Sequence, residues 1–176
     1  MSNSKTVWAL DPSHSEVQFK IKHLMIANVT GSFANYEANV TTNGDDFTTA
    51  SITFSADVAS ITTANEQRDG HLRSADFFDA DNFPKITFVA TKYTNDELHG
   101  DLTIKGITKS VKLSVEFGGI SKDPWGNTKA GFTITGKINR KDWGLNWNAA
   151  LETGGVLVSE EVKINCEIEL TKPQLV

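Results

Sequence analysis

The chain has 176 residues, a length that fits a single domain over residues 1–176 with a sizeable hydrophobic core. Its 39% hydrophobic and 22% charged residues are typical of a globular protein and exclude a disordered chain. The formal net charge of -5 argues against a nucleic-acid partner, because binding to phosphates needs concentrated Lys and Arg.

Strand signals fill the first third of the chain. Four segments are predicted to be strands, and in the second and fourth of them apolar and polar side chains alternate, which predicts one dry and one wet face. These segments are residues 6–10, 15–24, 32–42 and 51–58. We predict a connection or bend over residues 25–31 and a tight turn at residues 43–46, Asn-Gly-Asp-Asp. Because Phe33 and Val40 differ in parity, we also predict a bulge near Asn35.

One stretch, residues 65–88, interrupts this strand pattern and has helical character. Thr63 or Asn65 is a suitable N-cap for a helix that begins near Glu66 and runs to about Ser74. The segment after it, rich in Asp and containing Pro84, is predicted to be irregular until a strand resumes. The sequence therefore predicts one short helix of roughly two turns within a β protein.

The second half of the chain is predicted to be a series of hairpins. The expected strands are residues 85–93, 98–104, 111–117, 130–139 and 162–170. A turn is predicted at residues 106–109 and a loop at residues 118–128.

These elements predict an all-β fold: an antiparallel, eight-stranded, lipocalin-like barrel with a short helical cap between strands. Closure would bury the dry faces and remove exposed edges, and Gly100 and Gly136 suit the sharp coiling that closure needs. A two-sheet sandwich remains open at this stage, because alternation alone fits both folds.

Short motifs along nearly the whole chain resemble those of the YceI-like family, and they occur in the same order. They are HSEVQF at 14–19, GSF at 31–33, RDGHLR at 68–73, DFFD at 76–79, FPKITF at 83–88, GDLTIKG at 100–106, GF at 131–132 and NRKDWG at 139–144. Each motif alone is weak, but in this order they are highly specific. The resemblance implies an antiparallel barrel that holds a polyisoprenoid or another long-chain lipid, with a helical cap near one end, and it makes a homodimer plausible.

Many members of that family carry a secretion signal, and this chain departs from them. Its start, MSNSKTVWAL, has no cationic region and no long apolar run, so we expect a cytoplasmic protein, although a trimmed signal would leave no trace. No segment is apolar for long enough to span a bilayer, so no stable membrane insertion is expected. The single cysteine, Cys166, excludes an internal disulfide and has the parity of an inert buried thiol.

Candidate ligand-binding residues are the dry-face side chains of the strands and the residues in and around the helix. A long tail would bind through area alone, at about 0.8 kcal/mol per methylene removed from water. The candidates are Phe19, Ile21, His23, Phe33, Phe54, Arg68, His71, Phe77, Phe78, Phe88, Phe117, Phe132, Ile134 and Trp143. The alternative is that the apolar ones fill a solid core and that the barrel acts through surface protein–protein contacts, for example at residues 123–127.

The polar candidates also have two readings. Arg68 and His71 share a helix face with Leu72, where they would meet a polar or phosphate head, since Arg donates two hydrogen bonds at once. The favoured alternative is that Arg68 or Arg73 pins the helix by pairing with a nearby carboxylate, of Asp69, Asp76 or Asp79. His23 has dry-face parity and is interpreted first as a hydrogen-bonded interior residue.

Two tryptophans lie four residues apart near the end of a predicted strand, and the chain lacks the common enzyme motifs. Trp143 and Trp147 either flank an opening or close one end of the barrel by packing, and packing is the favoured role. Four separated histidines and one cysteine form no zinc pattern, and neither a phosphate-binding glycine loop nor a GxSxG motif is present. We therefore predict no catalytic residues, no metal and no cofactor; an enzyme acting on an isoprenoid lipid is the weaker alternative.

Overall fold

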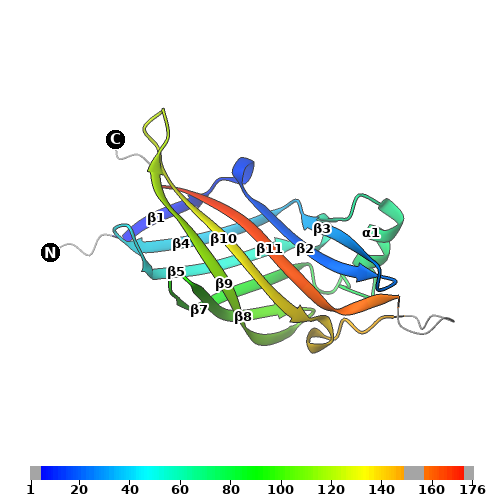
Figure 1. Ribbon diagram of the computed structural model, residues 1–176. Coiled ribbons are helices and arrows are strands. Elements are labelled where there is room, and N and C mark those ends of the chain that lie inside the picture. Colours follow the sequence, from blue (N-terminus) through cyan, green and yellow to red (C-terminus); the bar gives the residue numbers. More distant parts are fainter. Residues whose placement is uncertain (1–4, 149–156, 173–176) are drawn as a thin grey trace.

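The computed structural model describes residues 5–148 and 157–172, and most of these residues lie in β-strands (Figure 1). The strands are β1 (Lys5–Leu10), β2 (Glu16–His23), β3 (Ala27–Phe33), β4 (Tyr36–Asn43), β5 (Asp46–Asp57), β6 (Ile61–Thr62), β7 (Lys85–Tyr93), β8 (Glu97–Ile104), β9 (Ile107–Lys122), β10 (Thr128–Asn139) and β11 (Val158–Lys172). The remaining elements are helix α1 (Glu66–Arg73) and the 3-10 turns η1 (Pro12–His14), η2 (Val58–Ser60) and η3 (Arg140–Trp143).

The sheet closes on itself because β11 pairs with β1 as well as with β10. β1 and β2 both run along β11, as Leu10 pairs with Leu170 and Glu16 with Glu167, so they act as one strand interrupted by η1. β3 pairs with β2 while β4 pairs with β1, so they form a second interrupted strand. β5 and β6 form a third. Counted in this way, the fold is the predicted closed antiparallel barrel of eight strands.

The predicted helix and its neighbours are confirmed. α1 spans Glu66–Arg73, and the Asn65 side chain caps it by accepting a hydrogen bond from the backbone N of Arg68 at 2.9 Å. The strand predicted over 85–93 has the bounds of β7. The bulge predicted near Asn35 is absent; Ala34 and Asn35 instead form the break between β3 and β4, where the ladder changes partners.

Three sequence predictions about connections were wrong. Residues 27–33 form strand β3 rather than a bend, and β9 continues through Gly118 and Gly119 to Lys122 instead of entering a loop. The turn predicted at 106–109 lies at Lys105 and Gly106, so β9 already begins at Ile107. In β3 and β9 the alternating pattern is interrupted by Gly31 and by Gly118 and Gly119, which carry no apolar side chain.

Glycines inside the barrel make room for neighbouring side chains. A Cβ on Gly31 would overlap the ring of Phe19, and one on Gly136 would overlap the side chain of Leu113. A Cβ on Gly100 would overlap the Phe88 ring and lie 2.6 Å from the backbone O of Val89. Gly100 and Gly136, which were predicted to allow the sharp coiling of the sheet, are therefore also needed for packing, because a side chain at either position would overlap a neighbour.

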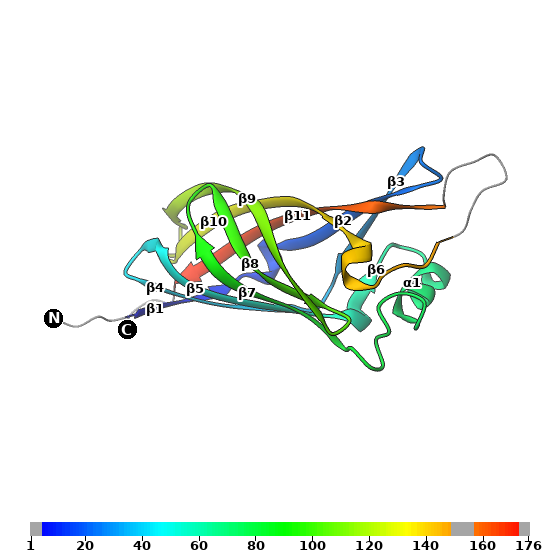
Figure 2. The same ribbon diagram turned by 90° about the horizontal axis from the view of Figure 1, so that it is seen from below.

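The two ends of the barrel differ. At the end where β1 begins and β11 finishes, five aromatic side chains pack together; we call them the aromatic plug, which consists of Trp8, Phe47, Tyr93, Phe117 and Phe132. Helix α1 and the β2–β3 hairpin lie at the opposite end, as Figures 1 and 2 show. Four of the five members of the plug are buried. In the described part of the chain, no helix is long and apolar enough to cross a bilayer.

Candidate functional site: an apolar cavity in the barrel

The barrel encloses a cavity of about 910 Å³ between the aromatic plug and helix α1. This volume lies within the range of small-molecule sites, roughly 300–1,000 Å³. Side chains in the middle of the wall point inward and yet are only half-buried, because part of their surface faces this space. Phe19, Phe54, Ile134 and Ile164 are such residues. The interior is therefore not a solid core.

Most of the residues selected from the sequence lie on the cavity wall. They are Phe19, Ile21, His23, Phe33, Phe54, Arg68, His71, Phe77, Phe78, Phe88, Phe132 and Ile134. Alternation identified the strand residues because inward and outward side chains follow each other along every barrel strand. The helical residues are present because α1 turns the face of Arg68, His71 and Leu72 toward the cavity, as its spacing predicted.

Phe117 and Trp143 are not part of the cavity wall, and these two assignments were wrong. Phe117 stacks on Phe132 with ring centroids 5.1 Å apart and belongs to the aromatic plug, but unlike Phe132 it does not line the cavity. Trp143 lies in the 3-10 turn η3, is 2% exposed, and donates a hydrogen bond from Nε1 to the Leu102 carbonyl at 2.9 Å. Strand parity gives no guide to direction in such a turn, and packing, the favoured alternative for Trp143, is its role.

The middle of the cavity is almost free of charge. Its wall combines aliphatic and aromatic side chains from all eight strands of the barrel and includes the thiol of Cys166. Cys166 is surrounded by protein, and this burial raises the pKa of its thiol to about 11, so the group is neutral at physiological pH. The wall offers a long apolar chain extensive contact and few hydrogen-bond partners.

Polar side chains gather at the open end, which we call the mouth; it is formed by His23, Arg68, His71, Phe77 and Trp147. His71 Nε2 lies 2.8 Å from Asp76 Oδ2, and its ring meets the Trp147 ring edge-on with centroids 4.8 Å apart. His23 is exposed, so its interpretation as an interior residue was wrong. It is the last residue of β2 and lies beside the hairpin turn, beyond the enclosed part of the barrel.

Helix α1 is held across the mouth by Thr63 rather than by the predicted ion pair. Arg68 donates from Nε to Thr63 Oγ1 and from Nη2 to Thr63 O, both at 2.7 Å. Asp69, only 2% exposed, accepts from the backbone N and the hydroxyl of the same threonine. Among residues 5–148 and 157–172, Arg68 has no carboxylate within ion-pair distance, while Arg73 lies 3.8 Å from Glu66.

Sequence reasoning missed the contribution of Arg140 to the mouth. This residue is 2% exposed and donates from Nη1 to the carbonyls of Leu145 at 2.6 Å and Trp147 at 2.9 Å, and from Nε to Ser159 O at 2.8 Å. Burial lowers the pKa of its guanidinium. Arg140 thereby ties the segment that carries Trp147 to β11. Because its partners are backbone carbonyls, no charge pattern in the sequence could indicate this role.

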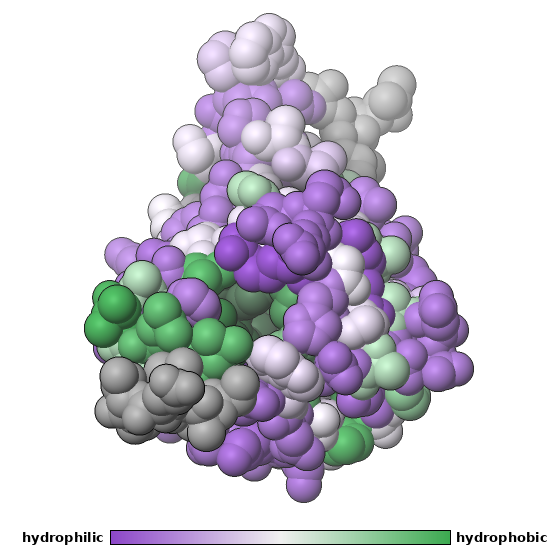
Figure 3. All heavy atoms as spheres, turned by 90° about the vertical axis from the view of Figure 1, so that its right-hand side faces the viewer, coloured by the Kyte–Doolittle hydropathy of each residue, from purple (hydrophilic) through white to green (hydrophobic). Residues whose placement is uncertain are grey.

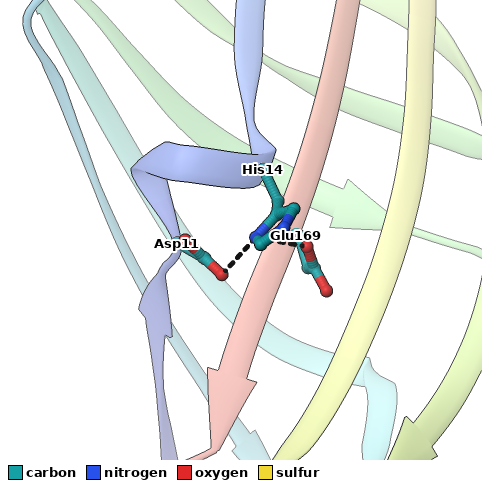
Figure 4. A group of neighbouring side chains, drawn as sticks. All are labelled: Asp11, His14 and Glu169. Carbon is teal, nitrogen blue, oxygen red and sulfur yellow. Dashed lines mark hydrogen bonds and ion pairs between the residues drawn. The ribbon is translucent and has the colours of Figure 1, made fainter. Parts of the chain in front are cut away.

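A second polar cluster lies outside the barrel, where η1 meets β11 (Figure 4). His14 Nδ1 is 2.9 Å from Asp11 Oδ2 and 3.4 Å from Glu169 Oε2. These residue types can ligate a divalent cation, and their ligand atoms lie within 4.8 Å of one another. However, Asp11 also accepts hydrogen bonds from Ser13 and from the Lys129 ammonium at 2.9 Å. The three side chains therefore already have partners in one another, in Ser13 and in Lys129. We call Asp11, His14 and Glu169 the clasp, because they link β1, β10 and β11.

A closed antiparallel barrel, plugged at one end and hollow up to a helix at the other, defines a lipocalin-like barrel with an internal cavity. The YceI-like domain family matches residues 8–170, and this chain belongs to that family. It is 45% identical to a UPF0312 protein of Staphylococcus aureus over 167 residues, which cover 94% of this chain and 98% of the relative.

Two solved structures have the same fold. The crystal structure of the Campylobacter jejuni YceI protein is 34% identical and superposes with a TM-score of 0.74, covering 88% of this chain and 91% of that one. A polyisoprenoid binding domain from Saccharophagus degradans superposes with a TM-score of 0.66 at 14% identity and covers 96% of this chain and 99% of its own. At that identity the second likeness concerns the fold alone.

Proposed function

We propose that this protein binds a long-chain isoprenoid-like lipid, or another amphiphile of similar shape, in the barrel cavity. The observation that carries the proposal is the cavity itself, about 910 Å³ of space with an apolar wall inside a closed barrel. Each methylene moved from water into such a wall contributes about 0.8 kcal/mol, so a long tail needs no specific polar partner. The name of the Saccharophagus degradans domain is consistent with this ligand class.

The polarity of the cavity suggests how such a ligand lies in it. The tail would extend toward the aromatic plug, and the head would stay at the mouth near Arg68, His71 and His23. Arg68 and His71 are held in place by Thr63 and Asp76, so the mouth is ordered before a ligand arrives. Binding of this kind removes a hydrocarbon from water, which serves transport, storage or sequestration of the lipid.

Two adjacent substitutions on β4 test the proposal. Ala38 faces the cavity, whereas Asn39 points outward and donates a hydrogen bond to Thr53 on the outer surface. Ala38→Phe places a ring in the space of at least two methylenes, so a fluorescent long-chain probe should bind about tenfold more weakly or not at all. Asn39→Phe adds the same ring outside and should leave binding unchanged. Equal affinities in both variants would contradict a ligand in the cavity.

A second candidate function, chemistry on the bound lipid, is favoured by the His71–Asp76 pair at the mouth. A histidine oriented by a carboxylate is a common arrangement for a general base. Incubation with long-chain isoprenoid alcohols and their phosphates, followed by product analysis, separates the two functions. Turnover that is lost in His71→Ala while binding persists would support an enzyme; unchanged lipid recovered from the wild type supports a binding protein.

A further inference from the structure

The turn between β2 and β3 exposes three consecutive aliphatic side chains. Leu24 is 37% exposed, Met25 49% and Ile26 85%, and we call these three residues the hairpin tip. Scattered single apolar residues are normal on a protein surface, but a contiguous group at a projecting point is not. Figure 3 views this end of the molecule and shows a hydrophobic patch on one side of a hollow in the surface.

The conformation of the turn makes this composition more unusual. Leu24 and Met25 have φ values of 55° and 61°, and Ile26 N donates a hydrogen bond to His23 O at 3.2 Å. Positive φ at both central residues is the form of a type I′ turn, for which Asn and Gly are strongly preferred. Bulky side chains rarely occupy this region. The aliphatic residues therefore weaken the turn that carries them, and folding gives no reason for their presence.

The hairpin tip is continuous with the mouth of the cavity. His23, which precedes the tip, and Val29, just beyond it on β3, both line the cavity. Leu24 N also donates a hydrogen bond to the carbonyl of Leu157, another lining residue, at 2.8 Å. A surface that receives the tip would consequently lie directly against the entrance.

We propose that the hairpin tip inserts into the outer part of a lipid bilayer and holds the mouth against it while a lipid passes between membrane and cavity. This inference rests on the proposed function, because a bilayer is where a long-chain lipid resides. Three side chains expose far less area than the about 800 Å² per partner that a stable protein interface buries, which argues against a second copy of the chain. Binding to a bilayer scales with the apolar area buried in its interface, so a few apolar side chains give weak, reversible docking.

The net charge of the chain indicates whether the protein is attracted by charged headgroups or by the apolar part of the bilayer. At -5, the protein has no net attraction to anionic lipids, so we assign the attraction to the apolar tip itself. Docking should therefore occur on uncharged phosphatidylcholine vesicles and should persist in high salt, since hydrophobic insertion is not screened as ion pairs are. Binding that requires anionic lipid and disappears with salt would contradict this mechanism.

The conformation of the turn allows a variant that removes the apolar tip without harming the fold. The triple variant Leu24→Asn, Met25→Gly, Ile26→Ser gives the type I′ turn its preferred residues, so its thermal midpoint should equal or exceed that of the wild type. In flotation with phosphatidylcholine vesicles it should bind about tenfold more weakly or not at all. The control Trp125→Ser changes a 79% exposed aromatic residue in the β9–β10 loop at the other end and should bind as the wild type does.

Several outcomes would overturn the proposal. These are absence of wild-type protein from the floated vesicles, undiminished flotation of the triple variant, and loss of flotation in Trp125→Ser alone. A concentration-dependent dimer that the triple variant abolishes would assign the tip to self-association instead.

Failure of docking is distinguishable from failure of ligand binding. The triple variant should take up a fluorescent long-chain probe added from ethanol as well as the wild type does. Ala38→Phe should float with vesicles as the wild type does but bind the probe about tenfold more weakly or not at all.

Discussion

Asp69 and Thr63 form a double hydrogen bond that fixes the helix over the cavity mouth. Asp69 Oδ1 accepts from the backbone N of Thr63 at 2.8 Å and from its hydroxyl at 2.6 Å, and the carboxylate is almost completely buried. The same threonine accepts from Arg68. Thr63, which precedes the helix, thus holds in place both the buried carboxylate of Asp69 and the guanidinium of Arg68, which faces the cavity.

Loss of this carboxylate should destabilise the protein. Asp69→Ala leaves two buried donors of Thr63 without an acceptor, which costs about 2–4 kcal/mol in the free energy of unfolding. Urea denaturation measures this difference. The control Asp81→Ala removes an exposed carboxylate from the following segment and should change stability by less than about 0.5 kcal/mol. Similar stabilities for both variants would show that α1 is held in place by other contacts.

The clasp of Asp11, His14 and Glu169 should make stability depend on pH. The hydrogen bond to Asp11, then the charge of Glu169, raises the pKa of His14 above 6.5, despite the opposing Lys129 ammonium. A raised pKa means that the stabilisation is complete below pH 6.5 and disappears as pH rises through the folded-state value. The thermal midpoint of the wild type should therefore exceed that of His14→Gln at pH 5.5, and the two should converge at high pH. A difference in thermal midpoint between the two proteins that widens as pH rises would contradict a raised pKa for His14.

The same clasp predicts a second effect in acid. Hydrogen bonds from Ser13, His14 and Lys129, in that order, hold the pKa of Asp11 well below its usual value. A depressed pKa contributes stability that is complete above the unfolded value near 3.8 and is lost as pH falls toward the folded one. Asp11→Asn should consequently narrow the difference in stability between neutral pH and pH 3. Acid unfolding curves of the two proteins test this.

Two glycines that accommodate neighbouring rings should respond differently to alanine. Gly100→Ala forces a Cβ against the backbone O of Val89 as well as the Phe88 ring, so it should cost about 1–3 kcal/mol of stability. Gly31→Ala meets only the outer end of Phe19, which can move into the cavity. It should therefore cost less stability but weaken binding of a long-chain probe. Denaturation and probe titration of both variants distinguish the two effects, and equal losses of stability would contradict the comparison.

Arg140 is expected to affect both the stability of the protein and the shape of the mouth. Arg140→Met leaves the carbonyls of Leu145 and Trp147 without their donor, at a cost of about 2–4 kcal/mol, and should also weaken probe binding by releasing Trp147. Lys141→Ala, which removes an exposed ion pair with Glu160, should have little effect on either property. Denaturation combined with tryptophan fluorescence follows both changes, and an Arg140→Met protein with wild-type stability would contradict this role.

Local sequence signals predicted much of this fold because their physical causes are local. Asn65 identified the start of α1, since a cap satisfies donors only a few residues away. Alternation identified β7 and the inward side chains of β10, because successive strand residues face opposite sides. The same rule placed Phe19 and Phe54 on the cavity wall.

The remaining features depend on contacts between distant parts of the chain. The first part of β3, residues 27–31, was missed because Gly31 supplies space for Phe19 and carries no apolar signal of its own. Phe47 joins the aromatic plug only because the register changes between the pairs Thr41–Ser51 and Asn43–Asp46. The partner of Arg68 was predicted to be a carboxylate, whereas the fold brings Thr63 to it. Charge patterns cannot indicate bonds to a hydroxyl or to the backbone.

The most direct test of the account is organic extraction of the purified protein followed by mass spectrometry of the extract. If the cavity holds a lipid, the wild type should yield a long-chain amphiphile in stoichiometric amount, and Ala38→Phe prepared in the same way should yield little or none. An empty wild-type barrel that also binds no added isoprenoid alcohol, isoprenoid phosphate or fatty acid would contradict the claim that the cavity holds a lipid.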